Sequence, residues 1–131
     1  MGYSVDMSAS ARRHLEAGNK LNVGKRRDVA GYLYGISAEC AVKALMLEAG
    51  FRPKTEKRLD PFYLHFPHLR TVLLDSLQGR RAAILGAFIF NGNFFSNWAI
   101  EMRYAKNEEI LGRWVDAWAE QATQAVSSIG T

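Results

Sequence analysis

The sequence predicts an all-α protein, arranged as an antiparallel up-and-down helical bundle of four main helices plus a short extra helix. Apolar side chains recur at three- and four-residue steps in several segments, which is the spacing of one helix face. Short connections rich in Gly, Pro and Asn separate these segments, and no segment shows the alternation of a half-buried strand. The 131 residues, 48% of them hydrophobic, suffice for one helical domain, residues 1–131, whose core needs no disulfide or metal.

Helix boundaries follow from capping residues and breakers. The helices are expected at residues 8–22, 28–50, 67–77, 80–90 and 107–129. Ser8 or Ser10 can cap the first helix, and Asp28 is placed to cap or open the second, which is the longest. Gly50 is expected at the carboxyl end of that helix, because glycine readily adopts a left-handed conformation.

The later elements are marked by local residues as well. Pro67 can open the short third helix at its first position, and Gln78-Gly79 breaks it. Asn91-Gly92-Asn93 is typical of a turn, and Glu108 with Glu109 suits the first turn of the last helix. The aromatic-rich part of residues 91–106 fits either a short helix or an irregular segment.

Charge and cysteine content bear on the partners of the protein and on its cellular compartment. The net charge of +4 arises in the first half, mainly in Lys25–Arg27 and in residues 52–58. These two clusters flank a helix about 35 Å long, so they form one nucleic-acid patch only if a dimer brings them together. A single cysteine, Cys40, the absence of a signal-peptide pattern and the absence of an 18-residue apolar run favour a cytoplasmic protein without membrane spans.

The long helix carries one polar stripe on an otherwise apolar surface. Tyr32, Gly35, Glu39 and Lys43 fall on this stripe at helical spacing. The stripe has two interpretations: Glu39 and Lys43 form a solvated i,i+4 ion pair, or they border a cleft or a second subunit. Gly31 and Gly35 each cost ~1 kcal/mol within a helix, so they predict the close approach of another backbone.

The segment before the last helix combines several functional side chains. Trp98, Glu101, Arg103 and Tyr104 lie within seven residues. Arg103 has two plausible uses. It can be buried against Glu39 or a backbone carbonyl, or it can bind a phosphate through its planar guanidinium.

The histidines give weaker patterns. His65 and His68 have a spacing that can share a metal on a helix, but Pro67 interrupts it, so loop and cap roles are expected. Arg58, six residues and His65 form an Arg–His spacing in the loop before the third helix, where a chance match is the simplest interpretation. No metal or cofactor is expected.

Three motifs occur in the order found in HEPN domains. Glu39 to Leu47 resembles the Glu-x-x-x-Lys core of their second helix, and His68-Leu69 resembles the His-x-Leu element at the start of the third. Trp98 to Tyr104 is similar to the Arg-Tyr signature before their last helix. The resemblance covers about residues 8–129. It implies a dimeric helical bundle, an RNA or nucleotide partner and, for many members, a metal-independent RNase toxin paired with a nucleotidyltransferase-like antitoxin.

One motif of the active members is incomplete. They carry an Arg, four to six residues and a His near the last helices. Arg103 occupies the Arg position, whereas the last histidine of this chain is His68. Whether the chain is an enzyme therefore stays open on sequence alone.

Three functional hypotheses follow. The leading one is a HEPN-like dimer that is nucleic-acid- or nucleotide-associated, or a toxin–antitoxin-type component with an antitoxin partner. Its polar cleft would consist of Glu39, Lys43, Trp98, Glu101, Arg103 and Tyr104. The alternatives are a catalytically inactive interaction or accessory module, and an endoribonuclease that uses Arg103 with a histidine from elsewhere, such as His68, with Glu39 as a further catalytic candidate.

Overall fold

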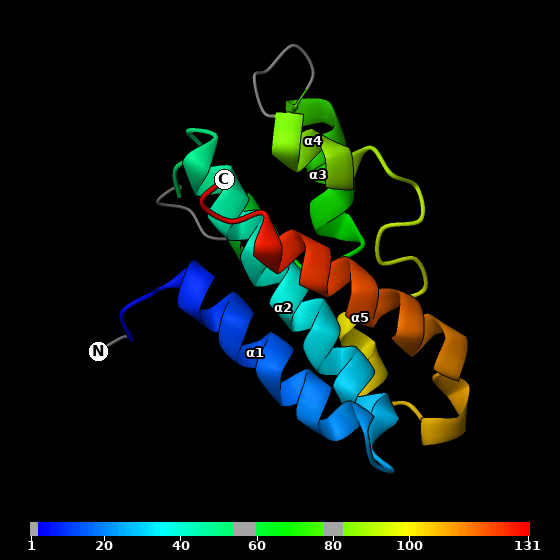
Figure 1. The fold of residues 1–131 in the computed structure, drawn as a ribbon. Helices are drawn as coiled ribbons and strands as arrows, with labels where there is room; N and C mark the ends of the chain where they lie inside the picture. Colours follow the sequence, from blue (N-terminus) through cyan, green and yellow to red (C-terminus); the bar gives the residue numbers. More distant parts are fainter. Residues whose placement is uncertain (1–2, 54–59, 78–82) are drawn as a thin grey trace.

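The computed structural model describes residues 3–53, 60–77 and 83–131, and it is helical without strands over them (Figure 1). The predicted all-α fold is therefore confirmed. The α-helices are α1 (Met7–Asn22), α2 (Arg27–Glu48), α3 (His68–Ser76), α4 (Ala83–Ile89) and α5 (Gly112–Ser127). Short 3-10 helices are η2 (Pro61–Tyr63), η3 (Ile100–Tyr104) and η4 (Asn107–Glu109).

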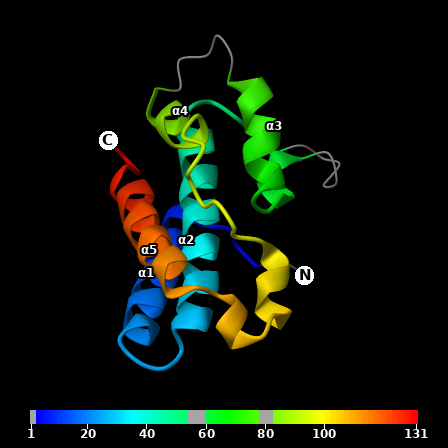
Figure 2. The ribbon, with the colours of Figure 1, turned by 90° about the vertical axis from the view of Figure 1, so that its right-hand side faces the viewer.

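The long helices α1, α2 and α5 lie side by side, and α2 is the central one (Figures 1 and 2). Most side chains of α2 are buried, as expected for a helix that is apolar over most of its circumference. The short helices α3 and α4 lie over the carboxyl-terminal end of α2 (Figure 2). The molecule is thus a bundle of three long helices that pack against one another, with a smaller helical pair at one end.

The directions of these helices differ in part from the up-and-down expectation. A tight turn reverses the chain between α1 and α2, so these two helices are antiparallel (Figure 1). By contrast, Arg27 at the start of α2 bonds with Asp116 near the start of α5, and Glu48 at the end of α2 accepts the N–H of Gly130 just after α5. Helix α5 therefore runs parallel to α2, because the two short helices and the segment after them return the chain to the start of α2.

The start of α1 corrects the predicted cap. Asp6, rather than Ser8 or Ser10, is the N-cap, and its carboxylate accepts the N–H of Ala9 at 2.9 Å. Ser8 and Ser10 lie inside the helix, which begins at Met7. Asp28 lies in the first turn of α2, in agreement with the sequence.

The carboxyl end of α2 has the geometry that glycine permits. Ala49 is the C-cap, and Gly50 follows it with φ +100°, in the left-handed region. The N–H groups of Gly50 and Phe51 bond to the carbonyls of Leu47 and Met46 at 3.1 and 2.9 Å. This is a Schellman motif, so the glycine has the predicted role one residue past the cap.

The beginning of the last helix was predicted too early. Residues Asn107–Glu109 form η4, and α5 begins only at Gly112. The N–H of Lys106 bonds to the Glu109 carboxylate at 3.0 Å, which closes η4 as a separate turn. Ile110 then adopts an extended conformation (φ −94°, ψ 100°) and packs against the core, so the helix cannot continue through it.

Helices α3 and α4 fall near their expected places. The buried side chains at the α3 end of the molecule include Leu69, Leu73 and Leu77. Pro67 is the N-cap of α3 rather than its first residue. The expected start of the fourth helix, residues 80–82, lies outside the described residues, as do most basic residues of the 52–58 cluster.

Residues 91–99 resolve the assignment that the sequence left open. After a turn that begins at Asn91, the chain runs without regular structure along α2 and then enters η3 (yellow in Figure 2). Phe94, Phe95 and Trp98 of this segment are buried, and Phe66 packs against all three rings. Core packing is therefore the main use of this aromatic series. None of the described helices is long and apolar enough to cross a membrane.

Candidate functional site

One face of α2 carries the residues from which the site is built. In order along the helix they are Asp28, Tyr32, Gly35, Glu39 and Lys43. Their three- and four-residue steps place them on a common face. Side chains and backbone from residues 65–66 and 98–104 of the same chain cover this face. The predicted polar stripe therefore faces two segments of its own chain.

Glu39 is the buried anchor of the site. The residue is 2% exposed, and its Oε2 accepts the N–H of Phe66 at 2.8 Å. Its Oε1 lies 2.8 Å from Nδ1 of His65. An ionised carboxylate can only accept hydrogen bonds, so with Glu39 ionised Nδ1 of His65 is the donor and Nε2 is the ring nitrogen left for another partner. The His65 side chain is 47% exposed, so a buried carboxylate orients a solvent-accessible histidine.

Lys43 lies one turn further along α2 and is also buried, at 6% exposure. Burial lowers the pKa of Lys43, while the charges of Glu39 and Asp60 oppose that change. Burial likewise raises the pKa of Glu39 above its ordinary 4.5, and the bonds from His65 and Phe66 oppose it. The solvated-pair interpretation of Glu39 and Lys43 is therefore wrong: both groups belong to a buried charged cluster.

Two indole rings occupy the space beside the glycines of α2. A Cβ at Gly31 would lie 2.9 Å from Trp118, and a Cβ at Gly35 would lie 1.8 Å from Trp98. Nε1 of Trp98 donates to the carbonyl of Gly31 at 3.0 Å. The glycines do mark a close neighbour, but it is an aromatic ring of the same chain rather than a backbone.

Arg103 lies on the surface of η3. Its guanidinium carbon is 5.0 Å from the centre of the Tyr104 ring, and a hydrogen bond with the Tyr32 hydroxyl raises the pKa of Arg103 above its ordinary value. The side chain is exposed, so the interpretation in which it is buried against Glu39 or a carbonyl is wrong. A cavity of about 180 Å³ adjoins it; its lining is Asp28, Val29, Tyr32, Met102, Arg103, Ala105 and Ile110.

The candidate residues from the sequence thus form two groups. Glu39 and Lys43 are buried, whereas Glu101, Arg103 and Tyr104 are exposed on η3. Tyr32, the residue of α2 that interacts with Arg103, lies seven positions before Glu39, or about 10 Å away along the helix axis.

Trp98 connects the two groups. It is 2% exposed and stacks on Tyr32 with ring centres 6.1 Å apart. The buried indole therefore packs beneath the Tyr32 ring and offers no surface to a ligand at η3. His68 is exposed at the start of α3, and no described histidine lines the Arg103 cavity.

Two residues near the site were not identified as site residues from the sequence. His65 was part of weak spacing patterns only, and its partner Glu39 is 26 positions away. Arg70 lines a cavity of about 380 Å³ between α3 and residues 92–99. No local pattern marks either residue, because both acquire their surroundings from distant segments.

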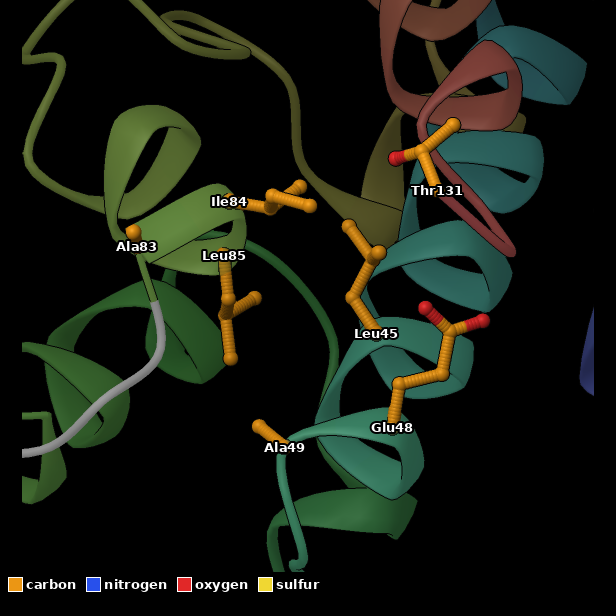
Figure 3. A pocket seen from close by; sticks show the side chains of 7 residues that line it. All are labelled: Leu45, Glu48, Ala49, Ala83, Ile84, Leu85 and Thr131. Carbon is orange, nitrogen blue, oxygen red and sulfur yellow. The ribbon is translucent and has the colours of Figure 1, made fainter.

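A further cavity lies at the other end of α2 (Figure 3). It measures about 330 Å³, with Ile84 and Leu85 of α4 on one side and Leu45 of α2 on the other. The Glu48 carboxylate at its edge accepts the N–H of Gly130 at 2.9 Å, so it is already engaged. Within the described ranges, no three His, Cys, Asp or Glu side chains gather in a way that could hold a metal ion.

Comparisons with known proteins do not add an assignment. No family model, no curated protein and no solved structure matches this chain. The chemistry of the site residues is therefore the starting point for its function.

Proposed function

We propose that this chain is a HEPN-like protein that binds RNA or a nucleotide through the surface of η3. In this proposal it acts as a homodimer and as a component of a toxin–antitoxin-type pair, with a nucleotidyltransferase-like or other antitoxin partner. The observation that supports binding is the pairing of the exposed Arg103 guanidinium with the 79% exposed Tyr104 ring.

The pairing has the two groups that single-stranded nucleic acid requires. A guanidinium binds phosphate oxygens through a planar fork of N–H groups. An exposed aromatic ring offers a face on which a base can stack, whatever its sequence. Tyr32, whose interaction with Arg103 raises the pKa of the guanidinium, also stacks on the buried Trp98, so the Arg103 surface adjoins the central helix.

Fluorescence anisotropy with a labelled single-stranded RNA of about 12 nucleotides tests the proposal. Arg103→Gln and Tyr104→Leu should each weaken binding about tenfold, and Arg103→Gln should also reduce the dependence of affinity on salt. Arg12→Gln, which removes an exposed arginine from α1, is the matched control and should leave the affinity unchanged. Equal affinities for Arg103→Gln and Arg12→Gln would refute binding at η3, and light scattering gives the oligomeric state.

A second function, metal-independent endoribonuclease activity, is favoured by the Glu39–His65 pair. With its Nδ1–H held by Glu39, His65 can accept the proton of a ribose 2′-hydroxyl at Nε2. The 2′-oxygen then bonds to phosphorus, the bond to the 5′-oxygen breaks, and that oxygen takes a proton from water. The products are a 2′,3′-cyclic phosphate and a 5′-hydroxyl.

The two exposed histidines form a matched pair for the test. In the presence of EDTA, His65→Ala should lower the cleavage rate about 100-fold or more, and His68→Ala should leave it near that of the unchanged protein. Similar rates for both variants would exclude His65 as the proton acceptor. If the unchanged protein does not cleave RNA, it acts by binding alone.

A further inference from the structure

Residues 92–98 hold an unusual backbone conformation. Phe95 and Asn97 have φ values of 53° and 69°, in the left-handed region, although neither residue is glycine. Such a conformation costs roughly 1–3 kcal/mol per residue and persists only where the surroundings impose it. Asparagine tolerates this region better than phenylalanine does, so Phe95 is the larger outlier.

Side chains of α5 impose this conformation. Gln121 accepts the N–H of Phe95 at 2.8 Å and donates to the carbonyl of Asn93 at 3.0 Å. Nε1 of Trp118 donates to the carbonyl of Ser96 at 3.0 Å. The Phe95 ring also stacks on Trp118, at 8° between the planes. The segment is therefore a preorganised wall rather than a loose connection.

This wall faces the start of α3 across the cavity of about 380 Å³. The cavity is lined by Phe66, Pro67, Arg70, Gly92, Phe94, Phe95, Ser96, Asn97, Trp98 and Ala99. Its volume falls in the range of small-molecule sites, and its lining combines aromatic rings with a few polar groups, as such sites do.

Arg70 is the charged residue that lines this cavity, and it is half-buried. Its Nε is buried and has no hydrogen-bond partner in the described part of the chain. The ion pairs found among the described residues also leave Arg70 out. A guanidinium stays charged at any ordinary pH, and a buried N–H of a charged group without an acceptor is costly. A ligand that supplies oxygen acceptors would remove this cost.

We propose that this cavity binds a small organic oxyanion, a carboxylate or a phosphate monoester, carried on a flat ring. The guanidinium of Arg70 binds two oxygens of the anion through Nε and one Nη. The ring lies in the cavity, whose lining includes the aromatic side chains of Phe66, Phe94 and Phe95. The site is separate from the Arg103 surface and does not depend on RNA binding there.

Isothermal titration calorimetry with four probes tests the proposal: phenyl phosphate, benzoate, inorganic phosphate and phenol. The two ring-bearing anions should bind at least about tenfold more tightly than inorganic phosphate or phenol. Only they combine an oxyanion for Arg70 with a ring for the aromatic part of the cavity. Comparing phenyl phosphate with benzoate tells which oxyanion the site prefers.

Variants separate this site from the Arg103 surface. Arg70→Gln should weaken phenyl phosphate binding about tenfold or more, and Arg70→Lys should restore only part of it, because lysine keeps the charge but loses the fork. Arg12→Gln should bind phenyl phosphate as the unchanged chain does, and a loss of binding in Arg103→Gln but not in Arg70→Gln would place the ligand at η3 and overturn the proposal.

Two results would overturn the proposal: no binding of either ring-bearing anion at concentrations up to about 10 mM, or equal binding by Arg70→Gln and the unchanged chain. Should Arg70→Gln fail to fold, the Nε–H resonance of Arg70 in the unchanged chain decides. A shift of that resonance on titration with phenyl phosphate supports the site, and a resonance that does not move rules it out.

Discussion

Gly35 is the position where the packing of the site can be tested most directly. It lies in the middle of α2, and Trp98 covers it so closely that the Cβ of an alanine would lie 1.8 Å from Cε2 of the indole. An ordinary van der Waals contact begins near 3.4 Å, so the ring would have to retreat by about 1.6 Å (3.4 minus 1.8). Gly35→Ala therefore forces the buried indole to move.

The energetic balance of Gly35→Ala has three parts. Alanine improves helix propensity by about 1 kcal/mol. Overpacking a close-packed core costs about 1–3 kcal/mol. The displaced indole also loses its 3.0 Å bond to the carbonyl of Gly31, which leaves a buried N–H unsatisfied and costs about 1–3 kcal/mol. The net expectation is a loss of about 3 kcal/mol of unfolding free energy.

Urea denaturation followed by circular dichroism measures this loss. The midpoint should fall while the slope with denaturant stays unchanged, because the native and unfolded surfaces remain similar. Gly24→Ala is the control: only the carbonyl oxygen of Leu21, at 3.9 Å, lies within contact distance of the added Cβ. It should change stability by less than about 0.5 kcal/mol.

A second background isolates the contact with the indole. In Trp98→Leu the smaller side chain leaves room for the added Cβ, so Gly35→Ala should become neutral or stabilising there. If Gly35→Ala in the unchanged chain is as stable as the parent, the close contact between Gly35 and Trp98 is refuted. If its cost persists in the Trp98→Leu background, the cost arises somewhere other than the indole.

Four further predictions have defined outcomes. Asn97→Ala should lose about 1 kcal/mol of stability while Asn97→Gly stays near the parent, because φ 69° suits glycine; equal losses would contradict strain at this residue. The raised pKa of Glu39 means that the folded state binds this proton more tightly than the unfolded state, so stability should fall as pH rises above 4.5, and thermal unfolding from pH 4 to 7 should show this fall reduced in Glu39→Gln. Glu39→Gln and Lys43→Gln should each destabilise the fold, but the double variant should lose less than the sum, with a coupling of about 1 kcal/mol in a urea cycle; strict additivity would show the two groups to be independent. Burial raises the pKa of the Cys40 thiol, so iodoacetamide should alkylate Cys40 at pH 8 more slowly than it alkylates a free cysteine. The 3.3 Å contact of Ser10 with the sulfur lowers this pKa, so Ser10→Ala should not increase the thiolate fraction on which the alkylation rate depends.

Helix positions were predicted best where the determining pattern is local. The rows of apolar side chains in α2 depend on a repeat of 3.6 residues, which can be seen within any two turns. Boundaries were predicted less well: Asp6, Ser8 and Ser10 are all good caps within five positions, so the local pattern did not distinguish among them. The start of α5 was missed because Ile110 leaves the helical conformation to reach the core.

The site was predicted in part for the same reason. Glu39 and Lys43 were singled out because they interrupt an apolar helix, and that pattern is local. The partner of Glu39 was missed, since His65 reaches it from a segment 26 residues away. The surroundings of Arg103 were likewise open, because η3 is short and its side chains take their positions from Tyr32 and Trp98.

The sequence by itself determined the fold class, the central buried helix and its polar stripe, because side-chain periodicity and backbone propensity act over a few residues. The tertiary structure decided the direction of α5, the burial of Glu39 with Lys43, the exposure of Arg103 and the cavity beside Arg70. These depend on segments that meet only after the chain has folded, through contacts such as Arg27 with Asp116 and Trp98 with Gly35. Burial changes the energy of a charged group, so the buried Glu39 and Lys43 differ in their properties from the exposed Glu101 and Arg103, although both pairs combine an acid with a base.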